Sequence, residues 1–337
     1  MKAVGYRQSL PISHAEALID LEIAEPTLGE HDLCVKVQAV SVNPVDTKIR
    51  KGVNPEPGET KILGWDATGE VEAVGSAVTL FKPGDQVWYA GALNRAGTNS
   101  ELHVVDERIV GHKPKSLSYA DAAALPLTTI TAWEILFDRF ALARSKASSD
   151  KSIVIIGAGG GVGSIMVQLA RKLTGLRVIG TASRPETRDW VYSLGAHEVI
   201  DHSHPLDEEL KRIGVASVGY IASLTSTDQH FASIVEAIAP QGHIGVIDDP
   251  EMIDVRKLKR KSVAFHWEFM FTRSLFATPD QIAQHHLLSE MATLIDEKMI
   301  RTTVGEHFGI INAENLKRAH QLIESGRSRG KVVLEGF

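Results

Sequence analysis

The stretch "SIVIIGAGGGVGSIMVQLARKL", residues 152–173, decides the fold of this chain. Four apolar residues, 153–156, predict a buried strand, a run of glycines follows at once, and the apolar spacing after it predicts a helix. Such a turn lets a pyrophosphate approach the backbone, because no Cβ intervenes, and the start of the helix offers it unpaired N–H groups. We therefore predict a dinucleotide site, with a turn that binds nothing as the alternative. Its residues are Gly157, Gly159, Gly160, Gly161, Val162 and Gly163.

Strand-like and helical segments alternate from residue 152 to the end of "GHIGVID" at 248, and the helices run to roughly 10–15 residues. This alternation predicts an α/β fold, a doubly wound parallel (Rossmann) sheet with helices on both faces. Residues 1 to about 115 differ, because short strand-like runs are separated there by Pro/Gly turns such as "NPEPGE" and "KPGD". The 337 residues thus predict two domains, a mostly β one and a nucleotide-binding one.

The end of the second strand of the nucleotide domain indicates which dinucleotide is bound. An NAD site places a carboxylate there to accept from the ribose 2′-hydroxyl. This chain reads "VIGTASRPETR", with Ser183 and Arg184 at that place and Arg188 one helical turn on. An arginine can pair with a 2′-phosphate, so we predict NADP(H). The alternative is that Arg184 is a solvated loop residue and that the site does not discriminate between NAD(H) and NADP(H). Leu224 and Thr225, after the fourth strand, are expected against the cofactor.

Composition excludes several classes of partner and location. The net charge is −6 with no dense basic stripe, which predicts no nucleic-acid binding. No apolar run reaches the ~18 residues of a membrane span, and the first ten residues lack the apolar core of a signal peptide. The single cysteine, Cys34, allows no disulfide framework. These features predict a cytoplasmic protein that acts on a small-molecule substrate.

Several motifs in this order resemble the medium-chain dehydrogenase/reductase superfamily, and within it the quinone oxidoreductase (zeta-crystallin-like) branch. They are "NPVDTKIRKG" (43–52), "GWDATGEVEAVG" (64–75), "KPGDQVW" (82–88), "ALPLTTITAWE" (124–134) and the glycine turn. "HWEFMFTRS" (266–274) and "GKVVLEGF" (330–337) are similar to bacterial proteins called zinc-type alcohol dehydrogenase-like. The resemblance implies a GroES-like catalytic domain, 1–125 completed by 298–337, a Rossmann domain, 126–297, and a homodimer through the edge of the Rossmann sheet.

The zinc in that family label conflicts with the residues present. In the zinc enzymes of the superfamily, the resemblance places a cysteine ligand where this chain has Asn43 and a histidine ligand within "GWD", at Trp65. An amide and an indole cannot replace a thiolate and an imidazole on zinc. The paired histidines His202/His204 and His285/His286 are expected in solvated positions. We therefore expect no metal ligands and no zinc.

Other catalytic patterns are also missing: the sequence has no Tyr-x-x-x-Lys pair and no G-x-S-x-G elbow. Hydride transfer to an acceptor that is already electrophilic, a quinone or an α,β-unsaturated carbonyl, needs only positioning and a proton source. The resemblance implies that Asn43 lies near the nicotinamide ribose and substrate, and Thr131 near the carboxamide. Tyr89, after a strand, is expected to donate a hydrogen bond or a proton to the substrate, or else to be a packed aromatic residue.

Two further features have structural interpretations. Asp46 and Arg50 are expected to form an ion pair that holds the loop after residue 42. Segment 265–274 is expected to pack in the core or a dimer interface, or to line a substrate pocket through Trp267, Phe269 and Phe271. A zinc alcohol dehydrogenase and an NADPH-binding protein without catalysis are the two alternative functions.

Overall fold

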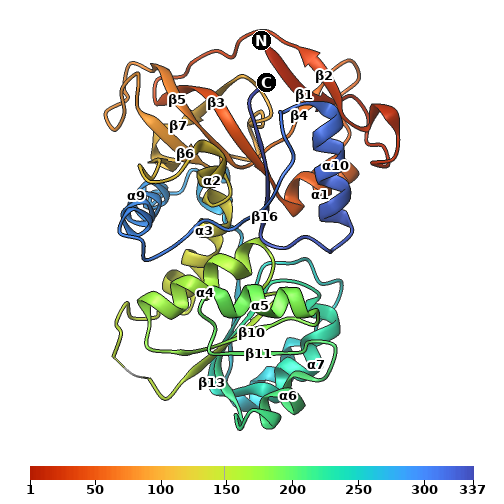
Figure 1. Ribbon diagram of the computed structural model, residues 1–337, viewed down its shortest axis with the longest axis vertical. Helices are drawn as coiled ribbons and strands as arrows, with labels where there is room; N and C mark the ends of the chain where they lie inside the picture. The colour runs from red at the N-terminus through yellow and green to blue at the C-terminus, as the bar shows by residue number, and fades with distance from the viewer. Residues whose placement is uncertain (148) are drawn as a thin grey trace. The chain divides into compact units, whose positions relative to one another are not determined.

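The computed structural model describes residues 1–147 and 149–337, which form two compact units (Figure 1). The first unit comprises Met1–Ile130 and Phe271–Phe337, and the second comprises Thr131–Met270. The nucleotide domain was predicted to end at residue 297, whereas residues 271–297 fold with the first unit. The reason is packing: α9 (Ala283–Asp296) lies against β8 (Val110–His112) of the first unit.

The first unit is built on β-sheets. A seven-stranded sheet has the order β15-β16-β3-β5-β6-β8, with β7 also pairing with β3, and a small sheet has the order β2-β1-β4. The strands are β1 (Lys2–Tyr6), β2 (Ile19–Glu22), β3 (Asp32–Val42), β4 (Lys61–Ile62), β5 (Ala67–Val74), β6 (Gln86–Tyr89), β7 (Leu102–Asp106), β8, β15 (Val304–His307) and β16 (Lys331–Glu335).

The C-terminal strand β16 completes this sheet by pairing antiparallel with β3 (Figure 1). The register sets Val332 opposite Val42 and Val333 opposite Ser41. Residues from the two ends of the sequence, Lys331 and Asn43, are therefore brought together at the end of the ladder. The C-terminal segment, which was predicted to return to the β domain, thus forms strand β16 beside β3.

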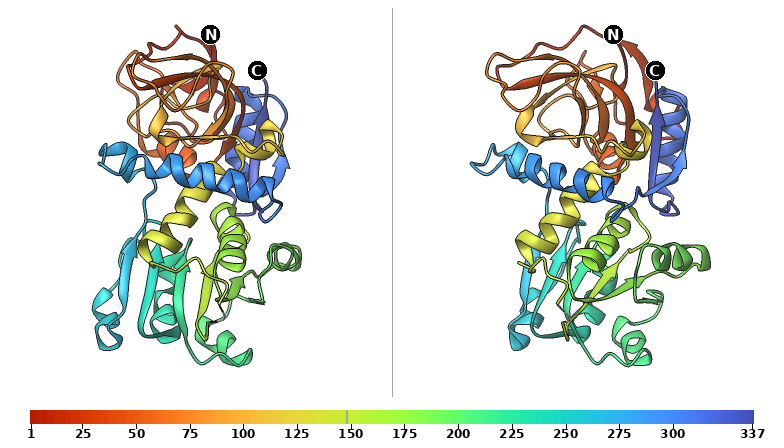
Figure 2. Two further views of the ribbon diagram at one scale, coloured as in Figure 1. Left: turned by 90° about the vertical axis from the view of Figure 1, so that its left-hand side faces the viewer. Right: turned by 60° about the vertical axis from the view of Figure 1, so that its left-hand side comes forward.

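Helices cover the edges of the first unit. Pro44 opens α1, where its fixed φ suits the first helical turn and its missing N–H costs nothing. Neither α1 nor α10 was predicted from the sequence; the two helices contact each other (Figure 1), and α10 also lies beside β16 (Figure 2). The helices are α1 (Pro44–Gly52), α2 (Tyr119–Ala123), α3 (Pro126–Trp133, which spans the boundary between the units), α8 (Thr272–Leu275), α9 and α10 (Ala313–Glu324), with 3-10 turns at Ala15–Ala17 and Glu107–Ile109.

The second unit is a parallel sheet of six strands in the order β11-β10-β9-β12-β13-β14. The order reverses between β9 and β12, and ligands of doubly wound sheets bind at the carboxyl ends of the strands beside such a reversal. The predicted α/β fold is confirmed. The strands are β9 (Ser152–Ile156), β10 (Arg177–Thr181), β11 (Glu198–Ile200), β12 (Val218–Ser223), β13 (Ile238–Val246) and β14 (Ala264–Trp267).

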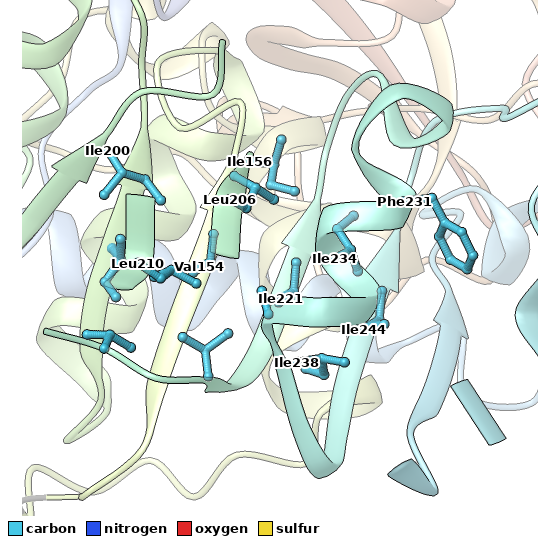
Figure 3. Packing of buried hydrophobic residues seen from close by; sticks show 14 of the residues in the cluster. Val154, Ile156, Ile200, Leu206, Leu210, Ile221, Phe231, Ile234, Ile238 and Ile244 are labelled. Atoms are coloured by element: carbon cyan, nitrogen blue, oxygen red, sulfur yellow. The ribbon is translucent and has the colours of Figure 1, made fainter. Parts of the chain in front are cut away.

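Both faces of this sheet are covered by helices. On one face, α6 and α7 bury Leu206, Leu210 and Ile234 against Val154 and Ile221 of the sheet (Figure 3). On the other face lie α4 and α5, which contact β9, β10 and β11. This two-sided burial explains why the strands read as apolar runs rather than as alternating patterns. The helices are α4 (Gly161–Leu173), α5 (Pro185–Ser193), α6 (Leu206–Arg212) and α7 (Thr227–Ala237), with a π-helical segment at Glu134–Arg139 and a 3-10 segment at Val255–Lys261.

Across the described ranges, 1–147 and 149–337, none of the helices combines the length and the apolar character that crossing a bilayer requires.

Candidate functional site

The glycine turn joins β9 to α4 at the carboxyl edge of the parallel sheet. Gly157 has φ of +80°, and its N–H donates to Thr181 Oγ1 at 3.1 Å. A Cβ on Gly163 would lie 2.3 Å from the carbonyl oxygen of Gly157, so only glycine fits there. Helix α4 starts at Gly161 without a side-chain cap, which leaves its first N–H groups open to an anion.

Two features beside the turn suit a polar ligand. A Cβ on Gly160 would meet no atom closer than 3.4 Å, so space is open outside the turn. The hydroxyl Oγ1 of Thr187, on α5, is buried and has no hydrogen-bond partner among the described residues. The same side chain approaches the turn, because its Cγ2 would lie 2.2 Å from a Cβ on Gly159. An orphaned hydroxyl next to open helix amides fits the phosphates of a dinucleotide.

The structure brings the other predicted cofactor residues to this edge. Thr225 and Leu224 follow β12 and lie 3.0 and 3.8 Å from the position of a Cβ on Gly157. Ser183 and Arg184 follow β10, and Arg184 stands at the N-cap of α5 with its Nε 3.8 Å from Glu186. Four of the five predicted residues therefore lie directly after β10 or β12, and the fifth, Arg188, lies in the first turn of α5.

His202 departs from its expected solvated position. It follows β11, is partly buried, and its Nδ1 lies 3.0 Å from Thr181 Oγ1. Because burial is the largest influence, its pKa lies below the ordinary value. The hydroxyl of Thr181 therefore links His202 to the Gly157 amide.

In the first unit, Asn43 is the centre of a buried polar network. Its Nδ2 donates to Asp66 Oδ2 at 2.8 Å and to the Trp65 carbonyl at 3.2 Å, while its Oδ1 accepts from the Lys331 ammonium. Lys331 Nζ also donates to Asp66 Oδ2 and to the Val42 carbonyl, each at 3.0 Å. The amide of Asn43 is thus held in one orientation, and only one lone pair of Oδ1 is left for a ligand.

Asp66 and Lys331 form an ion pair shielded from water, with both side chains almost fully buried. Burial raises the pKa of Asp66 and lowers the pKa of Lys331, and the contact between the two groups opposes both shifts. Asp66 accepts further hydrogen bonds from Leu127 N at 2.8 Å and Ser41 Oγ at 3.3 Å. This number of donors matches an ionised carboxylate.

The predicted ion pair between Asp46 and Arg50 is wrong, because each of the two residues has other partners. Asp46 accepts from the backbone N–H of Asn43 at 2.8 Å, and burial raises its pKa to about 7. Arg50 instead reaches α10, where its guanidinium contacts Glu324 and lies 3.4 Å from His320 Nδ1. Asp46 and Arg50 are four residues apart on α1 but have different neighbours, because α10 packs against this helix and takes up Arg50.

Tyr89 lies in the core of the first unit, which favours the packed-aromatic interpretation. Its ring stacks on His103 with centroids 5.4 Å apart, and its hydroxyl lies 3.1 Å from His103 Nδ1. His103 Nε2 faces the carbonyl of Ala96 at 2.9 Å and must donate to it, so Nδ1 accepts from the tyrosine. Burial raises the pKa of Tyr89 and lowers that of His103 to about 4.

We therefore expect Tyr89→Phe to retain its catalytic rate within about threefold, since the single hydroxyl proton is already donated to His103. Loss of the buried hydrogen bond is expected to lower the free energy of unfolding by about 1 kcal/mol. Steady-state kinetics and urea denaturation measure the two effects. A hundredfold fall in kcat with an unchanged free energy of unfolding would show instead that Tyr89 donates a proton to the substrate.

Thr131, Trp267 and Phe269 belong to the second unit, whereas Phe271 is the first residue of the chain to return to the first unit. Thr131 is buried in α3. Of the aromatic residues considered for a pocket wall, Trp267 is 56% exposed and Phe269 is 47% exposed, whereas Phe271 is buried and meets Trp65 edge-on. Phe271 is therefore a core residue of the first unit, and Trp267 and Phe269 lie at the surface of the second.

Three residues that the fold places in these sites were not predicted from the sequence: Thr181, Thr187 and Lys331. Lys331 belongs to the segment "GKVVLEGF", which the sequence had already singled out, but its partners Asp66 and Asn43 are 265 and 288 positions away along the chain. The available signal was a charged residue at the start of an apolar strand.

Comparison with known proteins matches the two parts of the chain to separate family models. Residues 29–128 match the alcohol dehydrogenase GroES-like domain, and residues 194–334 match zinc-binding dehydrogenase. A zinc-type alcohol dehydrogenase-like protein of Staphylococcus aureus (strain MSSA476) is 41% identical over 337 residues, covering 99% of both chains. The human mitochondrial NAD(P)H oxidoreductase RTN4IP1 is 30% identical over 333 residues, covering 90% of this chain and 81% of its own.

Solved structures agree with the fold described above. A candidate zinc-dependent alcohol dehydrogenase from Rhizobium etli CFN 42 superposes with a TM-score of 0.96 at 53% identity, covering 100% of this chain and 98% of its own. A quinone oxidoreductase from Pseudomonas syringae pv. Tomato DC3000 superposes with a TM-score of 0.84 at 25% identity, covering 99% of both. Both likenesses extend over the two units.

Proposed function

This chain belongs to the medium-chain dehydrogenase/reductase superfamily, and we propose that it is a zinc-independent, NADPH-dependent reductase of quinones or α,β-unsaturated carbonyl compounds. It is an oxidoreductase of that superfamily that uses NAD(P)H, and the choice of NADPH and of acceptor is the proposal. The single observation that carries it is the glycine turn, whose open helix amides and unpartnered Thr187 hydroxyl suit a dinucleotide.

Preference for NADPH over NADH is supported by the end of β10. Ser183 and Arg184 stand where NAD-binding proteins carry an acidic residue. Arg188 adds a second guanidinium in the same helix turn. Glu186 lies 3.8 Å from Arg184, at an exposed position where solvent screens the pair. A 2′-phosphate can therefore compete for the Arg184 guanidinium.

Zinc does not fit the residues of the Asn43 network. The groups at the positions that hold the metal in zinc enzymes are an amide, an indole and one carboxylate, and the carboxylate and the amide oxygen already accept from the Lys331 ammonium. Across the described ranges, no group of three or more His, Cys, Asp or Glu residues is placed to hold a metal ion. We propose that the ammonium of Lys331 is the fixed positive charge of this site.

NADPH, when bound, supplies the hydride to the electrophilic carbon of the acceptor. Asn43 contributes the remaining lone pair of its Oδ1, which can accept a hydrogen bond from a hydroxyl of the ligand. Thr131 is proposed to bind near the carboxamide. The pKa of Asp46, about 7, makes its carboxyl a group that exchanges a proton at neutral pH next to the Asn43 backbone.

We also propose a homodimer formed through β14. This strand is the last in the order of the parallel sheet, so its outer edge carries unpaired backbone groups. Trp267, at its end, is 56% exposed and packs edge-on against Phe265. An edge strand with exposed aromatic residues suits pairing with the same strand of a second copy.

The test is NADPH oxidation, followed by nicotinamide absorbance with metal-free protein, with a 1,4-quinone, an alkenal and a plain aldehyde as acceptors and NADH in parallel. We expect turnover of the quinone or the alkenal, and a kcat/KM at least tenfold higher with NADPH than with NADH. Light scattering on the same preparation measures the mass of the assembly, for which we expect two chains.

Three results would contradict the proposal. Reaction of the aldehyde alone, and only after zinc is added, would identify a zinc alcohol dehydrogenase. Tight NADPH binding without turnover of any acceptor would identify a protein that only binds the cofactor. Equal kcat/KM with NADH and NADPH would remove the role proposed for Ser183 and Arg184.

A further inference from the structure

A second buried polar cluster lies in the Thr131–Met270 unit, and nothing in the proposed function uses it. It consists of Glu134, Glu268 and Arg139, and the two glutamates are 1% and 3% exposed. Glu268 Oε2 accepts from Arg139 Nε at 2.8 Å, Glu134 lies 4.0 Å from the same guanidinium, and the two carboxyl groups are hydrogen-bonded to each other. Two carboxyl groups can share a hydrogen bond only when one of them holds a proton, so the cluster carries two acids, one guanidinium and one proton.

The cluster lies at the edge of the sheet that carries the glycine turn. Glu268 directly follows β14, and its N–H donates to the carbonyl of Val246, the last residue of β13, at 2.9 Å. Carboxyl ends of parallel strands are where doubly wound sheets bind ligands. Glu134 is three residues after Thr131 and therefore lies on the same side of the helix. It begins the π-helical segment Glu134–Arg139, and such segments are frequent at functional sites.

One oxygen of Glu268 is unused. Its Oε1 is buried and has no hydrogen-bond partner in the described part of the chain. Burial and the neighbouring Glu134 raise the pKa of Glu268 to about 9, so at neutral pH it is an uncharged acid. The single proton of the pair is already shared between the two acids, so Oε1 remains as a hydrogen-bond acceptor. A primary carboxamide offers N–H donors, and Oε1 can accept a hydrogen bond from one of them.

We infer that the Glu134–Glu268 pair is part of the dinucleotide site and that Glu268 binds the carboxamide of the nicotinamide ring. This inference rests on the proposed function, because it assumes that a nicotinamide dinucleotide binds. Glu134 acts as a positioning residue, which keeps the proton within the pair, and Arg139 orients Glu268 through Oε2. His266 is the other titratable group nearby, and burial, His243 and Arg139 all lower its pKa, so it stays neutral at pH 7.5.

The experiment compares the dissociation constants of NADPH and of its 3-acetylpyridine analogue, in which a methyl group replaces the amide nitrogen. They are measured for the wild-type chain, Glu268→Leu, Glu268→Gln and the surface control Glu208→Leu. We expect the wild type and Glu208→Leu to prefer NADPH at least fivefold, and Glu268→Leu to bind both ligands equally. Glu268→Gln, whose amide oxygen can still accept a hydrogen bond, is expected to keep most of the preference.

A pH series tests whether the proton of the Glu134–Glu268 pair affects NADPH binding or whether Glu268 only supports the structure of the site. Between pH 7.5 and 10 the dissociation constant of the wild type for NADPH is expected to rise about tenfold, as the pair loses its proton and the anionic ligand meets an added negative charge. Glu268→Gln has no such proton and is expected to show less than a twofold change.

An unchanged NADPH preference in folded Glu268→Leu, or the same pH series in Glu268→Gln and the wild type, would overturn the inference while leaving the proposed function in place. Failure of the wild type to bind either dinucleotide would overturn both. Circular dichroism of each variant confirms folding across the pH range, and Glu268→Gln, with nearly the shape of the native side chain, guards against misfolding of the leucine variant.

Discussion

Replacing Lys331 by methionine is expected to lower the free energy of unfolding of the first unit by about 3–5 kcal/mol. The ammonium is buried, and it donates to Asp66 Oδ2 and the Val42 carbonyl at 3.0 Å as well as to Asn43 Oδ1. Methionine fills much of the same volume, so the loss reflects the carboxylate of Asp66, which is left buried without its counter-charge. Urea denaturation followed by the fluorescence of the buried Trp65 and Trp88 measures the change.

The double variant Asp66→Asn/Lys331→Met distinguishes charge from packing. It removes both charges, and an amide at position 66 can still accept from Leu127 N, so we expect it to recover at least half of the lost stability. Lys36→Met is the matched control, because Lys36 lies on β3 of the same sheet but is exposed and 3.9 Å from Glu72. Its effect should stay below about 1 kcal/mol. Equal stability of Lys331→Met and Lys36→Met would show that the Asp66–Lys331 pair is not desolvated.

The fold of the second unit was predictable because its signals are local. Strands β9, β10 and β12 are short apolar runs, each followed by a helix, and the glycine turn marks where the first such pair begins. The domain boundary at residue 297 was misplaced for a different reason. Helix α9 is amphipathic, and its contacts with β8 and with the turn Glu107–Ile109, both in the first unit, decide the assignment.

The residues of the candidate sites also fall into two groups, those that local sequence patterns predict and those that depend on distant partners. Gly157, Leu224 and Thr225 were predictable because the carboxyl ends of neighbouring parallel strands must converge. Lys331 and Glu268 were not, since their roles depend on partners more than a hundred positions away. Residues of this kind are recognised by their burial, and burial of a charged group is a property of the whole fold.

In the proposed function, the Asn43 network takes the place that a metal ion has in the zinc enzymes of the superfamily. A metal ion in such a position supplies a fixed positive charge and holds the side chains around it. Here the Lys331 ammonium supplies the charge and binds the amide of Asn43 through Oδ1, while Asp66 binds the same amide through Nδ2. The ammonium also ties β16 to the end of β3, so the charge of the site and the closure of the sheet depend on one side chain.

Gly163→Ala is expected to weaken NADPH binding by at least a hundredfold and to lower the free energy of unfolding of the second unit by about 1–3 kcal/mol. The new Cβ would lie 2.3 Å from the carbonyl oxygen of Gly157 and 2.5 Å from Ala158 Cα. Both contacts are with backbone, so the turn itself must move and α4 must leave the sheet. The nucleotide fluorescence on titration measures affinity, and urea denaturation measures stability.

Gly160→Ala separates binding from folding at the same turn. Its φ is −77°, and the nearest atom to the new Cβ would be the carbonyl oxygen of Gly157 at 3.4 Å, so the protein alone has room for the methyl group. The methyl would occupy the open space before α4, and we expect binding to weaken about tenfold with stability unchanged. Gly219→Ala, whose Cβ would only touch the Lys151 side chain at 3.4–3.6 Å, should alter neither. If Gly160→Ala bound NADPH as tightly as the wild type, the phosphates would have to lie elsewhere, because a ligand on the helix amides cannot share that space with a methyl group.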